Sequence, residues 1–204
     1  MLSGGAVESV WSADAEHPFE MRVVYRWKAP NILDATTSVI AQKDLLGFEV
    51  FLASYFDGFA KSLVYVNACP ETEGKAAFLE AKRAGGQWQM FPRDAQAAEL
   101  VQDGRWQRPP NPVEWKIMPS LAGPLAMRRD AKTGLVGLVM ARPADCFAVS
   151  TPFSGEDHRS IYFSLFGRDL NAGQKATARS RLVIARGLSD REAIATYQAY
   201  LKET

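Results

Sequence analysis

The stretch SIYFSLFGRDLNAGQKATARSRLVIARG, residues Ser160–Gly187, is the part of the sequence that decides the fold. It begins with a run rich in aromatic residues, and the turn-forming segment DLNAG follows. From Lys175 to Leu182, basic or polar side chains then alternate with small or apolar ones. Alternation with a period of two is typical of a β-strand with one solvated face. The stretch therefore predicts two strands separated by a turn.

Similar strand signals recur in the rest of the sequence. In FEMRVVYRWKA, residues 19–29, successive side chains alternate in character, and FEVFLASYF at 48–56 is almost continuously apolar. AKSLVYVNA at 60–68 follows, and further short runs such as GLVGLVMARP and CFAVSTPF come after residue 112. Short apolar runs punctuated by Gly, Pro, Asn and Asp indicate antiparallel strands joined by short loops. We therefore expect a mainly β protein, an antiparallel β-sandwich.

Helical segments are expected in two places. Between about 71 and 103, ETEGKAAFLEAKR and PRDAQAAELVQDG are rich in helix formers, and glycines end both of them. This region is too poor in large apolar residues to bury a core of its own, so we expect a helical insertion within the sandwich. Near the C-terminus, Ser189 and Glu192 match a capping box, which predicts an amphipathic helix over about 189–202.

Length, charge and composition limit the class of protein. With 204 residues, the chain is expected to form a single domain over 1–204. The formal net charge of +1, from 24 basic and 23 acidic residues, argues against a nucleic-acid-binding protein. No signal peptide is visible in MLSGGAVESVW, and no apolar run reaches the roughly 20 residues that a membrane span requires. We expect a soluble protein without a membrane partner. Its compartment stays open, because a fragment of a periplasmic or secreted protein would look the same.

The sequence offers little for a metal or a cofactor. Cys69 and Cys146 lie far apart and outside any CxxC pattern, and His17 and His158 are the two histidines. A zinc site is therefore not expected. No P-loop, GxGxxG, HExxH, GxSxG or EF-hand pattern occurs, which argues against nucleotide, zinc-protease, serine-hydrolase and calcium-loop functions. We expect no cofactor and no metal.

The pattern of Ser160–Gly187 also resembles a known architecture. An aromatic strand, a turn containing Ala-Gly and a long alternating strand resemble the last strands of the galactose mutarotase-like supersandwich. LDATTSVIAQKDLLGFEVFLASYF, WQMFPRD and DGRW resemble a group of uncharacterised bacterial proteins with this architecture. The superfamily includes aldose epimerases and the sandwich domains of several polysaccharide lyases and glycoside hydrolases. The resemblance implies a sugar ligand on the concave face of a sheet. No stretch matches the epimerase catalytic motifs, so their residues are not transferred.

The densest titratable cluster lies in FSGEDHRS, where His158 follows Glu156 and Asp157. A histidine beside carboxylates can serve as acid or base near neutral pH, so His158 is a candidate catalytic residue. Asp157 is a candidate for sugar binding at the rim of a site. The simpler interpretation of the same segment is a solvated hairpin loop, in which polar residues satisfy the backbone.

Glu49 is the one acid in the apolar run GFEVFLASYF, and it is a second catalytic candidate. Alternation places Glu49 on the same strand face as Tyr55, so both could line a sugar-binding groove. If that face is covered, Glu49 must form an ion pair or shift its pKa. The candidate partners are arginines of the later strands: Arg128, Arg129 and Arg168. An exposed acid or a structural ion pair is the simpler interpretation.

Aromatic and arginine side chains are the candidate sugar contacts. Trp106 and Trp115 lie in or next to loop-like stretches, where an indole ring can stack on the apolar face of a pyranose. Glu114 precedes Trp115, and a carboxylate with a ring matches both the hydroxyls and the face of a sugar, so Glu114 is a third catalytic candidate. Arg128 and Arg168 could bind an acidic sugar or a phosphate through bidentate contacts. The structural alternative is that tryptophans cover the core and arginines form a solvated sheet face.

Carbohydrate binding on a concave sheet face is the leading hypothesis for the function. Two alternatives stay open. One is a sugar-active enzyme, epimerase-like or lyase-like, that uses Glu49 or Glu114 with His158. The other is a non-catalytic structural or interaction domain of a larger protein. The sequence indicates neither the sugar nor the oligomeric state.

Overall fold

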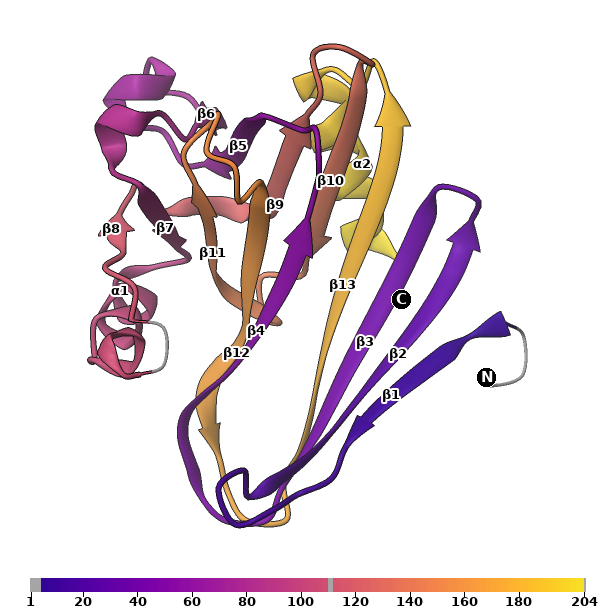
Figure 1. The fold of residues 1–204 in the computed structure, drawn as a ribbon, viewed down its shortest axis with the longest axis vertical. Coiled ribbons are helices and arrows are strands. Elements are labelled where there is room, and N and C mark those ends of the chain that lie inside the picture. The colour runs from indigo at the N-terminus through magenta and orange to yellow at the C-terminus, as the bar shows by residue number, and fades with distance from the viewer. Residues whose placement is uncertain (1–4, 110–111, 204) are drawn as a thin grey trace.

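The computed structural model describes residues 5–109 and 112–203, and two β-sheets packed face to face dominate it (Figure 1). The larger sheet has eight strands, which are in spatial order β1 (Val7–Trp11), β2 (Phe19–Ala29), β3 (Ile32–Ala41), β13 (Lys175–Arg186), β10 (Leu135–Ala141), β9 (Leu121–Arg129), β5 (Lys61–Val66) and β6 (Ala77–Glu80). The smaller sheet has five strands, in spatial order β4 (Leu45–Tyr55), β12 (Ser160–Leu170), β11 (Cys146–Pro152), β7 (Trp88–Pro92) and β8 (Lys116–Ile117). Paired strands are antiparallel except for the short parallel pair β7 and β8. The predicted β-sandwich is confirmed.

The two strands predicted from Ser160–Gly187 are β12 and β13, and they belong to different sheets. The turn between them crosses from one sheet to the other, and the β3–β4 connection crosses at the same end of the molecule (Figure 1). Backbone hydrogen bonds join the two crossings. Gly173 N–H donates to the Ala41 carbonyl at 2.8 Å, and Ala41 N–H donates to the Gln174 carbonyl at 3.1 Å. This segment therefore closes one end of the sandwich.

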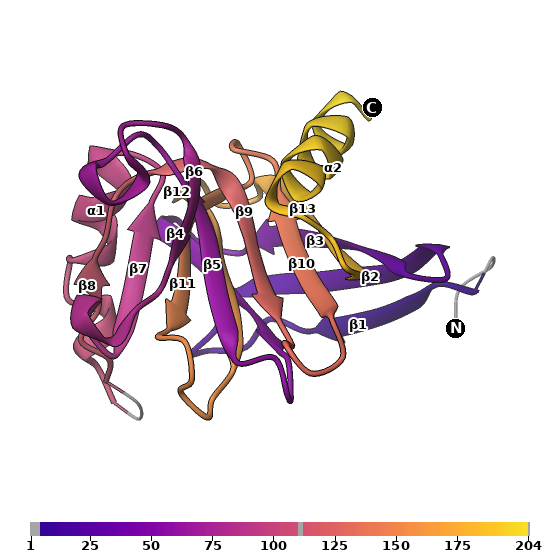
Figure 2. The same ribbon diagram turned by 90° about the horizontal axis from the view of Figure 1, so that it is seen from above.

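Three apolar clusters, each between two neighbouring layers, hold the structure together. The main cluster fills the space between the sheets and includes the fully buried Phe163. A second cluster, around Tyr197, joins the larger sheet to helix α2 (Asp190–Lys202). A third cluster, around Phe147, joins the outer face of the smaller sheet to helix α1 (Ala95–Val101). The order of layers is therefore α1, smaller sheet, larger sheet, α2 (Figure 2).

Both observed α-helices begin where the sequence predicts. The Ser189 hydroxyl accepts the Glu192 N–H at 3.3 Å, and the Glu192 carboxylate accepts the Ser189 N–H at 2.9 Å, so the capping box of α2 is confirmed. The Asp94 carboxylate accepts the Ala97 N–H at 2.8 Å and caps α1. In the described part of the chain, neither helix has the length and apolar character needed to cross a membrane.

The prediction of a helix over 71–83 is wrong. The segment instead contains β6, in which Leu79 pairs with Val64 and Phe78 pairs with Tyr65 on the edge of the larger sheet. Phe78 packs toward the α2 side of this sheet and Leu79 toward the main core, so both faces of β6 are used. Pairing with β5 and this two-sided burial outweigh the helix propensity of the segment.

The larger sheet extends beyond the smaller one at β1 and β2, as both views show (Figures 1 and 2). β1 pairs with β2 alone, so its other edge is free within the described residues. Apolar side chains on this extension are exposed: Val7 by 48%, Trp11 by 47% and Trp27 by 61%. We call these three residues the exposed apolar strip.

Candidate functional site

β4 divides its side chains between the core and the outer face of the smaller sheet. Phe48, Val50 and Leu52 pack in or against the main core. Glu49 and Tyr55 lie on the opposite face, as the alternation predicts, and Tyr55 is 63% exposed. Every candidate on this strand is therefore directed toward the same outer face.

Seven rings gather on this outer face, and we call them the aromatic surface. They come from β4, β7, β12 and the segments before β8 and β12: Phe51, Tyr55, Trp88, Trp106, Trp115, His158 and Tyr162. Phe51 and Tyr162 are stacked, with ring centroids 4.6 Å apart. Trp106 lies 4.5 Å from Phe51 and 5.4 Å from Trp115. The rings therefore form one connected layer.

His158 lies at the exposed end of the aromatic surface. Its ring centroid is 5.3 Å from that of Tyr55 and 5.3 Å from that of Trp88. Its backbone N–H donates to the Glu156 carboxylate at 2.6 Å, which fixes the loop before β12. The structure therefore places His158 beside Tyr55. Trp88 connects His158 to Trp115, because the ring centroids of Trp88 and Trp115 are 6.0 Å apart.

Asp157 lies on the same loop and is exposed. Its carboxylate is 3.5 Å from the Arg159 guanidinium, which also contacts Asp57 at 3.1 Å. Arg159 therefore links the loop before β12 to the turn after β4. Asp157 is available to a ligand at the rim of the aromatic surface, while its charge is partly balanced by Arg159.

Glu114 is exposed beside Trp115 and lines two hollows with it. One hollow, of about 400 Å³, also includes Trp88 and Lys116. The other, of about 230 Å³, also includes Trp106. His158 lines neither hollow, so the structure does not group Glu114 with His158 in one hollow.

Glu49 lies at the buried end of the outer face, with its side chain 9% exposed. Burial raises the pKa of Glu49, and the Arg105 guanidinium opposes that rise from 3.1 Å. Glu49 and Tyr55 are six positions apart on β4, which corresponds to about 20 Å. The structure therefore does not bring Glu49 and His158 together around one sugar atom.

The prediction that Glu49 pairs with Arg128, Arg129 or Arg168 is wrong. Glu49 pairs with Arg105, which also donates to the Gly47 carbonyl at 2.7 Å. Arg105 comes from the segment after α1, which folds back over β4. That contact joins residues 56 positions apart, and the alternation of neither segment predicts it.

Arg128 is fully buried between the sheets and does not reach the surface. Its guanidinium donates to the carbonyls of Phe59 at 3.1 Å and Ser160 at 3.2 Å, and to the Thr151 hydroxyl at 3.3 Å. Burial lowers the pKa of Arg128 to about 10, so the group stays charged at neutral pH. It cannot contact a ligand directly as expected, but it holds the loop that follows Tyr55 and the start of β12 that follows His158.

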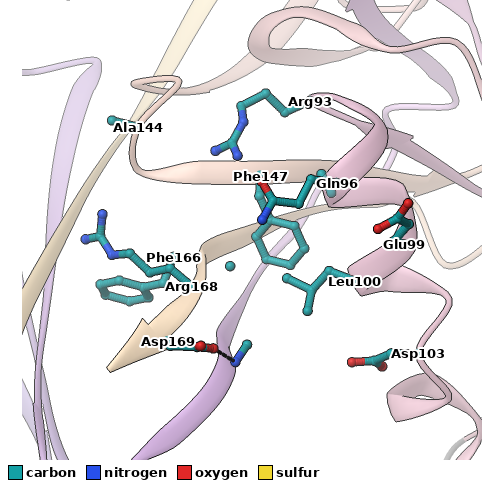
Figure 3. A pocket seen from close by; sticks show the side chains of 13 residues that line it. Arg93, Gln96, Glu99, Leu100, Asp103, Ala144, Phe147, Phe166, Arg168 and Asp169 are labelled. Atoms are coloured by element: carbon teal, nitrogen blue, oxygen red, sulfur yellow. Dashed lines mark hydrogen bonds between the residues drawn. The ribbon is translucent and has the colours of Figure 1, made fainter. Parts of the chain in front are cut away.

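Arg168 lies at the other end of β12, far from His158. It lines a separate cavity of about 660 Å³ between the end of β12 and α1, together with Arg93 and Phe147 (Figure 3). Arg168 and Tyr55 therefore belong to different parts of the outer face.

Two rings at the centre of the aromatic surface, Phe51 and Tyr162, were not among the candidates from the sequence. The signal for Tyr162 was present, because Ser160, Tyr162 and Ser164 alternate with three apolar core residues of β12. This alternation predicts a strand with one face in the core and Tyr162 on the opposite face. The register Tyr162↔Ala53 shows its pairing with β4.

Metal-binding side chains do not cluster in the described residues: no three His, Cys, Asp or Glu groups come together in a way that could hold an ion. Cys69 and Cys146 are both free thiols.

Known structures share this fold at very low sequence identity. The Slr1438 protein from Synechocystis sp. PCC 6803 is 8% identical with a TM-score of 0.50, over 91% of this chain and 63% of that one. The α-N-acetylgalactosaminidase NagBb from Bifidobacterium bifidum is 12% identical with a TM-score of 0.53, over 96% and 28%. The α-galactosidase from Lactobacillus brevis is 9% identical with a TM-score of 0.51, over 97% and 25%. No protein-family model and no curated protein matches the sequence.

These similarities define the architecture and leave the activity open. The chain spans less than two thirds of the Synechocystis structure and about a quarter of each glycosidase. What these similarities support for this chain is the β-sandwich fold. Membership of an uncharacterised bacterial group stays a prediction.

Proposed function

We propose that the protein binds a carbohydrate on the aromatic surface of the smaller sheet. The observation that carries the proposal is the convergence of seven rings from separate segments on one outer face. Tyr55 and His158 are its exposed members, and Trp88 is partly exposed beside His158 at the open end of this layer. Aromatic rings of this kind offer flat apolar faces with polar tips.

The chemistry of the rim suits a sugar. A pyranose has an apolar face of C–H groups that can stack on a ring, and hydroxyls that need hydrogen-bond partners at the edge. Asp157, His158 and the Tyr55 hydroxyl supply such partners beside the rings. Glu114 supplies a carboxylate beside Trp115. The similarity in fold to an α-galactosidase and an α-N-acetylgalactosaminidase supports a sugar as ligand.

A glycan array followed by calorimetric titration of the best hit tests this proposal. We expect Tyr55→Ala and Trp115→Ala to weaken the affinity by about tenfold or more, since removing an aromatic anchor costs over 1 kcal/mol. Trp27→Ala is the matched control, because Trp27 is 61% exposed but lies on β2, outside the aromatic surface.

Two results would overturn the proposal. One is an array on which no glycan binds the wild-type protein. The other is a glycan whose affinity falls equally in Trp27→Ala and Trp115→Ala, which would place the contact elsewhere. Turnover of the bound sugar in the same titration would indicate a sugar-active enzyme, and His158→Ala would then test the role of the imidazole.

A further inference from the structure

A cavity of about 660 Å³ lies at the end of the outer face remote from His158 (Figure 3). We propose that it is a second binding site, which takes the carboxylate or phosphate group of a small molecule between Arg168 and Arg93. Gly47, at the cavity, and Tyr55 are eight positions apart on β4, which corresponds to about 26 Å. The cavity is therefore distinct from the aromatic surface, and its ligand does not depend on the sugar proposed there.

Arg168 is the side chain that suits the cavity to an anion. It is exposed, and over residues 5–109 and 112–203 it forms no ion pair and no side-chain hydrogen bond. Its guanidinium lies 5.9 Å from the centroid of the Phe166 ring, a contact that supports the group and leaves its donors free. A planar guanidinium matches a carboxylate or a phosphate through paired N–H groups.

Arg93 provides a second guanidinium with a fixed position. Its Nε donates to Asp94 at 2.7 Å, and its Nη1 donates to the Pro143 carbonyl at 3.2 Å. These bonds hold the group while leaving Nη2 available. Figure 3 shows the Arg93 and Arg168 guanidinium groups on one side of the cavity and the Glu99 and Asp103 carboxylates on the other. The cationic side is therefore the place for an anionic group.

The carboxylates around the cavity are mostly engaged elsewhere. Asp103 is bound by Arg105 at 2.8 Å, and Asp169 accepts the Gly47 N–H at 2.7 Å. Glu99 is the exception, and it projects from α1 on the side away from the arginines. Arg168 has no carboxylate partner in the described residues, whereas Arg93 is paired with Asp94 and keeps Nη2 as a donor for an anion.

The backbone before Arg168 is strained in a way that shapes the cavity. Phe166 has a φ of 73° and Gly167 a φ of 61°, at an irregularity in the pairing of β12 with β4. A bulky residue rarely adopts this left-handed region. A Cβ on Gly167 would lie 2.4 Å from the Phe147 ring, so glycine is needed for the chain to pass. Bulges of this kind redirect side chains and occur near binding sites, where strain is retained.

A titration of the isotope-labelled protein with inorganic phosphate, followed by amide NMR, tests the site. We expect shifts of amides near Arg168, Gly167 and Arg93, and weaker binding by about tenfold in Arg168→Gln, since one charge-assisted contact is lost. Arg26→Gln is the matched control, because Arg26 is an exposed arginine on β2 and should leave the affinity unchanged. Glu99→Gln removes the free carboxylate and should keep or tighten binding.

Three results would refute the site. They are no amide shift near Gly167 at any phosphate concentration, an unchanged affinity in Arg168→Gln, and an equal loss in Arg26→Gln. Because Arg168 is exposed, Arg168→Gln is expected to fold, and the dispersion of its amide spectrum checks this directly. A positive phosphate result combined with an empty glycan array would support this site while rejecting the proposed function.

Discussion

A single buried arginine connects the core to the proposed binding surface. Arg128 enters from β9 and donates to the backbone on both sides of the open end of the aromatic surface, at Phe59 and Ser160. No carboxylate lies within ion-pair distance of Arg128 in the described residues, so main-chain oxygens balance its charge. A buried group of this kind is costly unless it is fully hydrogen-bonded.

Arg128→Met is expected to loosen the loops before β12 and after β4. The substitution keeps an apolar stem but leaves the Phe59 carbonyl without its donor, which should lower the free energy of unfolding by about 1–3 kcal/mol. Hydrogen exchange should accelerate at residues 152–160, and urea denaturation gives the stability. Arg128→Lys keeps the charge but cannot span these partners, so it should show the same change in exchange. Unchanged exchange in both variants would contradict this role.

At the scale of elements, a glycine decides how closely α2 approaches the sheet. Gly123 on β9 lies under Tyr197, and a Cβ at Gly123 would be 2.6 Å from the Tyr197 ring. Tyr197 is 3% exposed and belongs to the cluster beneath α2. The missing side chain therefore creates the space that the tyrosine ring fills.

Gly123→Ala is expected to push α2 away from the larger sheet. Overpacking of this type costs about 1–3 kcal/mol, and thermal or urea unfolding measures it. In a Tyr197→Leu background the same substitution should cost less, because the ring that it meets has been removed. An equal cost in both backgrounds would show that the ring contact is not responsible.

Local patterns in the sequence predict the elements but not all of their partners. Alternation correctly divides β4 between Phe48 in the core and Tyr55 on the outer face, and the capping residue Ser189 correctly begins α2. Local pattern fails at 71–83, where helix formers predict a helix but pairing with β5 forms β6 instead. It also cannot supply Arg105 as the partner of Glu49, because that contact depends on how the segment after α1 folds back.

The candidate site shows the same limit. The sequence identifies several rings that meet on the outer face, including Tyr55, Trp106 and Trp115. It also groups Arg128 and Arg168 with them, although one is buried and the other lies at the far cavity. The type of a residue indicates whether it can contact a sugar, whereas the register of the sheet decides which residues share one surface.

At the scale of the whole molecule, the unequal size of the two sheets leaves an apolar area uncovered. The exposed apolar strip on β1 and β2 continues the sheet past the edge of the smaller one. An exposed edge strand with apolar side chains is a common route to association.

Trp27→Lys is expected to reduce self-association at high protein concentration without lowering the unfolding temperature, because Trp27 is 61% exposed. Light scattering as a function of concentration measures the effect. Leu46→Lys is the control, since Leu46 is 83% exposed but lies on β4 of the other sheet. Equal effects of the two substitutions would indicate a general response to added charge.

The way in which Arg128 holds the loops also bears on how freely their sequences can change. Its bonds to Phe59 and Ser160 are made to main-chain oxygens, which every amino acid possesses. Substitutions of surface side chains in these loops, and of Tyr55 at the adjoining end of β4, therefore leave the anchor intact. A library that randomises Tyr55, Asp157 and His158 should consequently retain the fold in most of its members, so the rim can be retargeted to new ligands on an unchanged scaffold.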